Sequence, residues 1–125
     1  MKLLKLIPAA AIALTSFATF EAKAMQICVY NNAGFDMRFW VKRTSWKYPY
    51  SKATGYYGAG QTNCIKMSDI PVNVGQSYNV YYQWSTHEYG EKSSCAKNKT
   101  RQSSDSGTTK TYTVSGTTTN SSCEL

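Results

Sequence analysis

Two stretches of the chain alternate between apolar and polar side chains, which is the pattern of a β-strand that buries one face. In the first stretch the apolar positions are Phe35, Met37, Phe39 and Val41, and the positions between them are Asp36, Arg38, Trp40 and Lys42. In the second stretch the predicted inward face is Tyr78, Val80, Tyr82 and Trp84, and the outward face is Asn79, Tyr81 and Gln83. Both stretches are therefore predicted to be half-buried strands.

Four further segments carry weaker strand patterns, at 26–30, 62–67, 109–115 and 117–125. Residues 31–34, rich in Asn and ending in Gly, are typical of a tight turn with positive φ. Residues 44–61 show no sustained alternation and are predicted to be a long loop with at most one short strand. The polar stretch 85–107 fits either a loop pinned by a disulfide or a weak edge strand. Together these elements predict about six to eight antiparallel strands in a small two-sheet β-sandwich, with a small barrel as the alternative.

Composition supports the all-β class. After residue 24 the chain has a single Leu, Leu125, and four Ala, so the apolar residues that favour helices are scarce. The same region has twelve Thr, ten Tyr and six Val. These β-branched and aromatic residues suit a pleated, half-buried surface.

The first 24 residues have the features of a signal peptide. Lys2 and Lys5 form a positive start, residues 6–14 are apolar, and Ala22-Lys23-Ala24 is a small-x-small cleavage pattern. We therefore expect one secreted or periplasmic domain at residues 25–125. An uncleaved leader acting as an anchor is the alternative. No apolar run after residue 24 approaches the ~20 residues of a membrane-spanning helix.

Four cysteines in an exported chain of this size predict two disulfides. Three pairings are open. We favour Cys28–Cys123 with Cys64–Cys95, on the argument that the first and last strands of small sandwiches often lie side by side. A zinc site is not expected, because the cysteines form no CxxC pair and His87 is the only histidine. No metal and no cofactor are predicted.

Three stretches of sequence resemble a loosely defined family of small secreted β-sandwich proteins of fungi and bacteria. They are Val29-Tyr30-Asn31-Asn32-Ala33-Gly34-Phe35, the central Gly60-Gln61-Thr62 with Cys64-Ile65, and Tyr112-Thr113-Val114 with Gly116-Thr117-Thr118 and Cys123. The resemblance implies a sandwich fold and secretion. It transfers no functional residue, since the family has no established activity. The chain departs from the pattern between Lys42 and Gly60.

Aromatic residues in that divergent segment are the candidate binding site. They are interleaved with lysines and punctuated by Gly and Pro, so we expect a loop on the surface. Exposed Tyr and Trp rings are suited to stacking on sugars or lying at a membrane interface. The predicted site residues are Trp46, Lys47, Tyr48, Tyr50, Lys52, Tyr56 and Tyr57.

Charge indicates an anionic partner. Without Lys2, Lys5, Lys23 and Glu21, residues 25–125 keep a net charge of +5. Two groups of basic residues stand out: Lys42, Arg43, Lys47 and Lys52, and then Lys92, Lys97, Lys99 and Arg101. We expect an anionic polysaccharide or cell-surface glycan, with membrane-surface contact as a second option, and do not expect nucleic acid. An inhibitor of lysozyme, a basic enzyme, would be expected to carry acidic surface instead.

Catalysis is not predicted. A small ribonuclease would use His87 as general acid, Glu88 or Glu91 as base, and Arg38 or Arg101 to neutralise the phosphate. However, adjacent residues on a strand point to opposite faces, so His87 and Glu88 would not meet one phosphate. The cysteines are expected in disulfides and no GxSxG motif is present. We therefore predict a secreted, non-catalytic binding protein, with a secreted toxin or membrane-active effector as first alternative and a small basic ribonuclease as second.

Overall fold

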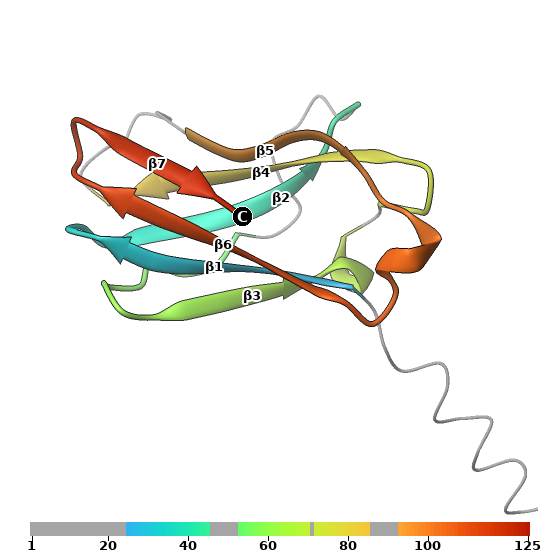
Figure 1. Cartoon of the computed structure of the whole chain (residues 1–125), viewed down its shortest axis with the longest axis horizontal. Helices are drawn as coiled ribbons and strands as arrows, with labels where there is room; N and C mark the ends of the chain where they lie inside the picture. Colours follow the sequence, from blue (N-terminus) through green and yellow to red (C-terminus); the bar gives the residue numbers. More distant parts are fainter. Residues whose placement is uncertain (1–24, 46–52, 71, 86–92) are drawn as a thin grey trace, which may run out of the picture.

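The computed structural model of the protein describes residues 25–45, 53–70, 72–85 and 93–125. Within these ranges seven strands form two stacked sheets (Figure 1), as predicted for a two-sheet all-β fold. Sheet 1 has the strand order β3-β1-β6-β7 and sheet 2 the order β2-β4-β5. The strands are β1 (Gln26–Ala33), β2 (Met37–Arg43), β3 (Thr62–Lys66), β4 (Ser77–Trp84), β5 (Ser93–Thr100), β6 (Thr109–Gly116) and β7 (Ser121–Glu124). Two 3₁₀ turns, η2 (Met67–Asp69) and η3 (Ser103–Asp105), follow β3 and β5.

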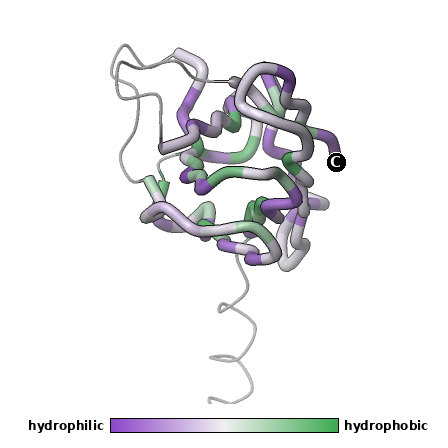
Figure 2. The backbone as a smooth tube through the Cα atoms, turned by 90° about the vertical axis from the view of Figure 1, so that its left-hand side faces the viewer, coloured by the Kyte–Doolittle hydropathy of each residue, from purple (hydrophilic) through white to green (hydrophobic). Residues whose placement is uncertain are grey.

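The two alternating stretches became β2 and β4, and their apolar faces form the core. Phe39 and Val41 of β2, together with Tyr78 and Val80 of β4, are completely buried between the sheets. Figure 2 shows the most hydrophobic stretches of backbone running through the middle of the domain. Burying such side chains contributes about 1.5–3 kcal/mol each to folding, so these two strands supply much of the core's stability.

The outward face of β2 and β4 is less solvated than alternation predicts. Trp40, Asn79 and Gln83 are only 4%, 7% and 3% exposed, although all three lie on the side of sheet 2 away from the core. Alternation therefore assigned these residues to the correct face, but it did not predict that this face is also largely covered.

Strand direction departs from the prediction at one place. β1 pairs antiparallel with β3 but parallel with β6, in a register running from Gln26↔Thr109 to Ala33↔Gly116. The sandwich is therefore mostly, and not wholly, antiparallel. Periodicity reports which face a side chain occupies and carries no information on strand direction, so the sequence pattern could not reveal this pairing.

The predicted turn at residues 31–34 is wrong, because β1 continues through Ala33. Asn31 is fully buried and its side chain is fully used. Its Nδ2 donates to the carbonyls of Phe35 and Tyr57 at 2.8 and 3.1 Å, and its Oδ1 accepts from the Ala33 amide at 2.9 Å. The amide group thus binds the chain after β1 to the chain before β3.

All four cysteines form disulfides, but the favoured pairing is wrong. Cys28 bonds to Cys64, its direct partner across β1 and β3, and Cys95 of β5 bonds to Cys123 of β7. The first and last strands are not neighbours, because β6 lies between β1 and β7. Cys95–Cys123 joins the two sheets at one open side of the sandwich. Two disulfides indicate an oxidising compartment outside the cytoplasm.

The described part of the predicted long loop follows β2 closely. Residues 53–57 form two isolated bridges to that strand, Trp40↔Ala53 and Met37↔Tyr57. Met37 and Tyr57 exchange both backbone hydrogen bonds, at 3.0 and 2.8 Å. This segment covers the outer edge of β2.

Other boundaries shift by a few residues. The predicted strand 62–67 ends at Lys66, where η2 begins, and the polar stretch 85–107 contains β5, an edge strand of sheet 2. The predicted strand 117–125 shortens to β7, because Gly116 has φ +108° and turns the chain sharply there. In the described ranges, no helix has the length and apolar character needed to cross a membrane.

Candidate functional site

The structure separates the two predicted site residues that it describes. Tyr57 points into the sandwich and is 6% exposed, whereas its neighbour Tyr56 is 46% exposed. The expectation that the Tyr57 ring is exposed on a surface loop is therefore wrong, since the ring packs in the core and its hydroxyl donates to the Val29 carbonyl at 2.8 Å. Trp46, Lys47, Tyr48, Tyr50 and Lys52 lie outside the described residues.

Tyr56 belongs to a surface group with β2 and β4. The guanidinium carbon of Arg38 lies 5.0 Å from the centre of the Tyr56 ring, a cation–π contact. Arg38 also donates two hydrogen bonds to the Gln83 side-chain oxygen, at 2.9 and 3.3 Å, across the register pair Arg38↔Gln83. Arg38 is therefore held by the ring on one side and the amide on the other.

The next cross-strand pair is Trp40 with Tyr81. Their ring centres are 5.9 Å apart and their planes are inclined by 38°. The Tyr81 hydroxyl accepts a hydrogen bond from Asn79 Nδ2 at 3.0 Å. The pairs Arg38↔Gln83, Trp40↔Tyr81 and Lys42↔Asn79 thus alternate cationic, aromatic and amide groups on this face of sheet 2.

Asn79 also shapes the edge strand beside it. Its Oδ1 accepts from the Asn98 amide at 2.7 Å and from the Thr44 hydroxyl at 3.3 Å. Asn98 has φ 53° and lies where the β4–β5 register shifts, so a bulge in β5 is fixed by this side chain. The bulge leaves Lys97 exposed next to it.

A polar groove opens between β5 and β7, and we call it the β5–β7 groove. It encloses about 460 Å³ and is lined by Tyr81, Tyr82, Ser93, Ser94, Lys97, Ser121, Ser122 and Cys123. The Tyr82 hydroxyl lies 2.7 Å from the Ser121 hydroxyl, which ties the two sheets together at the base of the groove. Tyr81 is shared between the groove and the ring pair on sheet 2, so the two surfaces are continuous.

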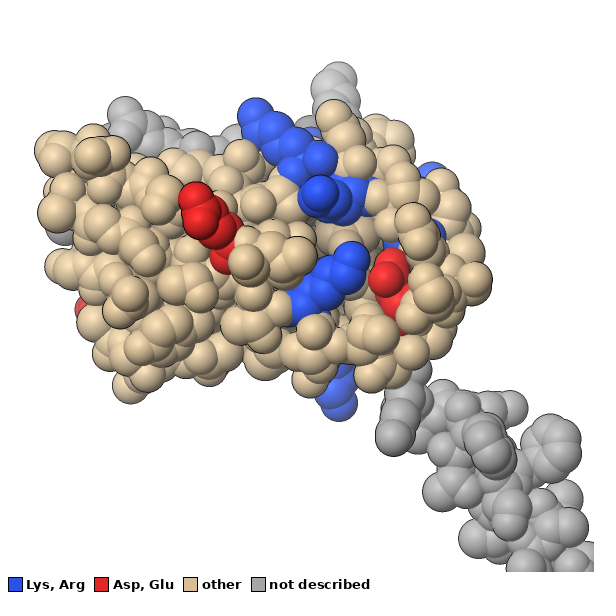
Figure 3. All heavy atoms as spheres, in the orientation of Figure 1, with Lys and Arg blue, Asp and Glu red and all other residues tan. Residues whose placement is uncertain are grey.

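The fold brings the two predicted basic groups toward each other. Arg43 of β2 pairs with Tyr78 of β4, and Tyr78 pairs with Lys99 of β5, so one described member of each group lies in the same row of sheet 2, with β4 between them. Figure 3 shows basic side chains gathered over the middle of the face that carries β5 and β6, with acidic side chains on either side. This arrangement could not be inferred from the sequence, in which the two basic groups stand far apart.

Of the residues of the ribonuclease alternative, only the two arginines belong to the described ranges. His87, Glu88, Glu91 and Lys92 lie outside the described residues. Arg38 is held by Gln83 and Tyr56, whereas Arg101 donates to the Val72 carbonyl at 2.5 Å beyond the end of β5. Among residues 25–45, 53–70, 72–85 and 93–125, no group of three or more His, Cys, Asp or Glu could hold a metal ion.

Sequence reasoning missed the β5–β7 groove. Its serines stand in two polar stretches, 93–94 and 121–122, that carry no binding motif. The signal that could have found them is the cysteine beside each pair, because a Cys95–Cys123 disulfide draws both stretches together.

Comparison of the chain with protein-family models, with curated proteins and with solved structures gave no match.

Proposed function

We propose that the protein is a secreted, non-catalytic binding protein whose ligand is an acidic glycan, held in the β5–β7 groove against Tyr81. The observation that carries this proposal is the composition of the groove, whose lining residues include four serines, two tyrosines and one exposed lysine. Its volume of about 460 Å³ is in the range of small-molecule binding clefts.

Each group in the groove matches a part of an acidic sugar. Serine hydroxyls both donate and accept hydrogen bonds, as sugar hydroxyls do. The Tyr81 ring offers a flat amphipathic face for a sugar ring, and the Lys97 ammonium is a partner for a carboxylate or sulfate. A neutral glycan would leave the ammonium without an anionic partner.

The groove is also preorganised. The Cys95–Cys123 disulfide and the Tyr82–Ser121 hydrogen bond fix its two walls relative to each other. The Asn79 side chain holds both the Tyr81 hydroxyl and the backbone bulge next to Lys97. Little conformational entropy is then lost on binding, which favours affinity for a small ligand.

Membrane binding has less support in the described residues. Their exposed large hydrophobic side chains are Tyr56, Val74 and Leu125, which belong to three separate segments of the chain. Scattered apolar residues of this kind are ordinary on soluble proteins. A contiguous apolar surface would be needed to insert among lipid tails.

The test compares binding of polygalacturonate, chondroitin sulfate and neutral dextran by isothermal titration calorimetry. We expect binding of at least one acidic polymer, no binding of dextran, and about tenfold weaker binding by Lys97→Gln, the scale of one lost charged hydrogen bond. Lys66→Gln is the charge-matched control, because Lys66 is on β3 at the opposite edge of sheet 1, and it should stay within twofold of wild type.

Two outcomes would contradict the proposal: no binding of either acidic polymer, or equal loss in the two lysine variants. Phosphatidylglycerol vesicles form a separate arm of the experiment. Binding to vesicles without binding to glycans would favour the membrane-active alternative.

A further inference from the structure

β3 is an outer strand of sheet 1, and one of its edges has no neighbouring strand among the described residues. Thr62, Cys64 and Lys66 are exposed, whereas Ile65 between them is buried in the core. β1 lies on one side of β3, and no described strand lies on the other.

The pairing register shows which backbone groups of β3 are used. In an antiparallel pair only alternate residues exchange hydrogen bonds with the partner strand. Just beyond the two ends of β3, Asn31 donates to the Gln61 carbonyl at 2.9 Å and Met67 donates to the Met25 carbonyl at 2.8 Å. The odd-numbered residues of β3 therefore bond to β1.

It follows that the N–H and C=O groups of Thr62, Cys64 and Lys66 point away from β1. The 4.0 Å separation of the Cys28 and Cys64 Cα atoms fits such a non-hydrogen-bonded pair. These groups have no backbone partner in the part of the chain that the structure describes.

A groove of about 600 Å³ runs beside this edge. One wall is β3 with Ser68 and Asp69 of η2, and the other is the segment bridged to β2. The lining residues are Ala53, Thr54, Gly55, Asn63, Cys64, Ile65, Lys66, Ser68 and Asp69. The second wall has small side chains and is itself fixed, because Thr54 exchanges hydrogen bonds with the backbone of Phe39 through its amide and its hydroxyl, at 2.9 and 3.0 Å.

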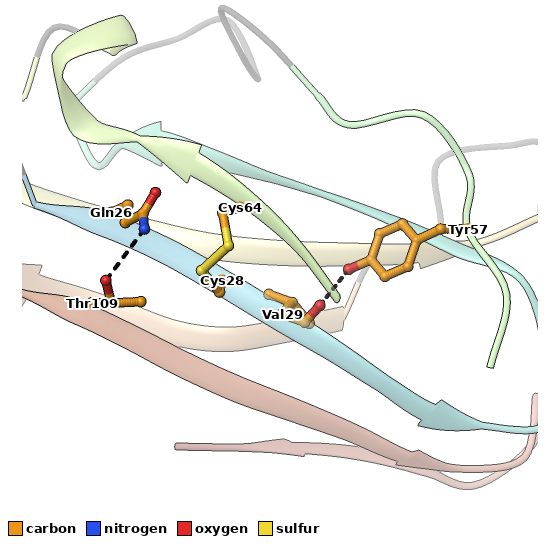
Figure 4. The surroundings of a disulfide bond; sticks show 6 residues. All are labelled: Gln26, Cys28, Val29, Tyr57, Cys64 and Thr109. Carbon is orange, nitrogen blue, oxygen red and sulfur yellow. Dashed lines mark hydrogen bonds between the residues drawn. A yellow bond between two sulfur atoms is a disulfide. The ribbon is translucent and has the colours of Figure 1, made fainter. Parts of the chain in front are cut away.

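A disulfide holds β3 rigidly against β1. Figure 4 shows the Cys28–Cys64 disulfide crossing directly from β1 to β3. The covalent link prevents β3 from separating from the sheet, so its outward groups keep the spacing of a strand. A preordered edge loses less entropy on binding than a loose one.

We propose that this groove binds an extended peptide segment of a partner protein, which adds to sheet 1 as a strand next to β3. Unused backbone groups along a strand edge recognise another extended backbone. The second wall favours a single strand over a second copy of this chain, whose edge would bring a whole sandwich against that wall. Lys66 and Asp69 at one end offer partners for an acidic and a basic side chain.

The probe is a linear heptapeptide selected by phage display on the oxidised protein. Two variants at position 66 distinguish the contribution of the backbone N–H to peptide binding from that of the side-chain charge. Lys66 has φ −78°, which a proline can adopt, so Lys66→Pro removes one outward N–H without disturbing the bonds to β1. Lys66→Ala removes the charge and keeps the N–H.

We expect the selected peptide to shift the amide signals of Thr62, Cys64 and Lys66 in two-dimensional NMR. Binding should weaken about five- to tenfold in Lys66→Pro and less than threefold in Lys66→Ala. If Lys66→Pro does not fold, N-methylation of alternate peptide residues replaces it, and only one of the two alternating sets should abolish binding.

The proposal is overturned if no peptide is selected, if the shifted amides lie outside 53–55 and 62–69, or if both methylation sets bind equally. It is also overturned if these amides shift on dilution of the protein alone, since that result would assign the edge to a dimer.

Discussion

The Tyr57 hydroxyl donates a hydrogen bond to the Val29 carbonyl at 2.8 Å (Figure 4). This bond lies on the side of the sandwich opposite the Cys95–Cys123 disulfide. Tyr57 is in the segment that is bridged to β2, an edge strand of sheet 2, whereas Val29 is in β1 of sheet 1. The hydrogen bond therefore connects the two sheets. The opposite side is closed by the disulfide and by the hydrogen bond between Tyr82 and Ser121. Each open side of the sandwich is therefore crossed by a hydrogen bond that involves a tyrosine hydroxyl.

Tyr57 should be essential for stability. Tyr57→Phe loses one buried hydrogen bond and is expected to lower the free energy of unfolding by about 1 kcal/mol, and Tyr57→Ala by about 3–5 kcal/mol because it also leaves a cavity. Urea denaturation measures both values. Tyr56→Ala is the control, and since its ring is half exposed it should cost less than about 1 kcal/mol. Equal losses at 56 and 57 would contradict the structure.

Tyr78→Phe is expected to affect stability in the opposite direction to Tyr57→Phe. Its hydroxyl is buried and has no hydrogen-bond partner among the described residues. Tyr78→Phe should therefore leave the melting temperature at neutral pH unchanged or raise it, because a buried, unpaired hydroxyl is unfavourable. A melting temperature that falls as far as in Tyr57→Phe would show that the Tyr78 hydroxyl has a partner.

The effect of Tyr78 on stability should also depend on pH in the alkaline range. Its pKa is raised from 10.0 to about 12, mainly by burial, with smaller contributions from the neighbouring Tyr112 and Asp105 that act against the lowering effect of Arg101. Between these values the unfolded chain releases the proton and the folded chain keeps it, so stability is constant below pH 10 and falls as pH rises toward 12. Burial raises the pKa of Tyr57 and Tyr112 too, which adds to the fall. Thermal melts from pH 9 to 12 should show a shallower decline for Tyr78→Phe, and identical slopes would contradict this assignment.

The two disulfides should contribute almost equally to stability. They close loops with sequence separations of 36 and 28 residues, for which the chain-entropy relation gives about 3.5–4 kcal/mol each. Cys28→Ala with Cys64→Ala, and Cys95→Ala with Cys123→Ala, are the double variants to compare by urea denaturation. Peptide mapping without reduction should recover the same pairs, and a Cys28–Cys123 peptide would refute this fold.

Asn31 should tolerate no change of its amide group. In Asn31→Asp the two carbonyls that now accept from Nδ2 would face a carboxylate oxygen, so several kcal/mol of stability should be lost. Asn31→Ala removes three hydrogen bonds and is expected to cost about 2–4 kcal/mol. Chemical denaturation checks both, and a loss below 1 kcal/mol for Asn31→Asp would mean that the side chain is not buried.

Local sequence patterns predicted the faces of β2 and β4 and the all-β class, because alternation and β-branched composition are properties of short segments. They did not predict pairing. Whether β1 neighbours β6 or β7, and hence which cysteines meet, depends on contacts between residues roughly eighty apart in sequence.

The candidate site illustrates the same limit. Tyr56 and Tyr57 are adjacent on an extended segment, so their side chains point in opposite directions, and alternation alone argues against both being exposed. Which of them is buried depends on the bridge between Met37 and Tyr57. The groove serines were missed because they come from strands of different sheets, which the Cys95–Cys123 bond brings together.

The most direct test of glycan binding at the β5–β7 groove is a two-dimensional NMR titration of the oxidised protein with an oligogalacturonate. We predict that the amide signals of residues 81–82, 93–97 and 121–123 shift in a saturable manner and that raising the salt concentration weakens the effect. Saturable shifts confined to other residues, or no shifts at millimolar oligogalacturonate, would contradict the proposed site.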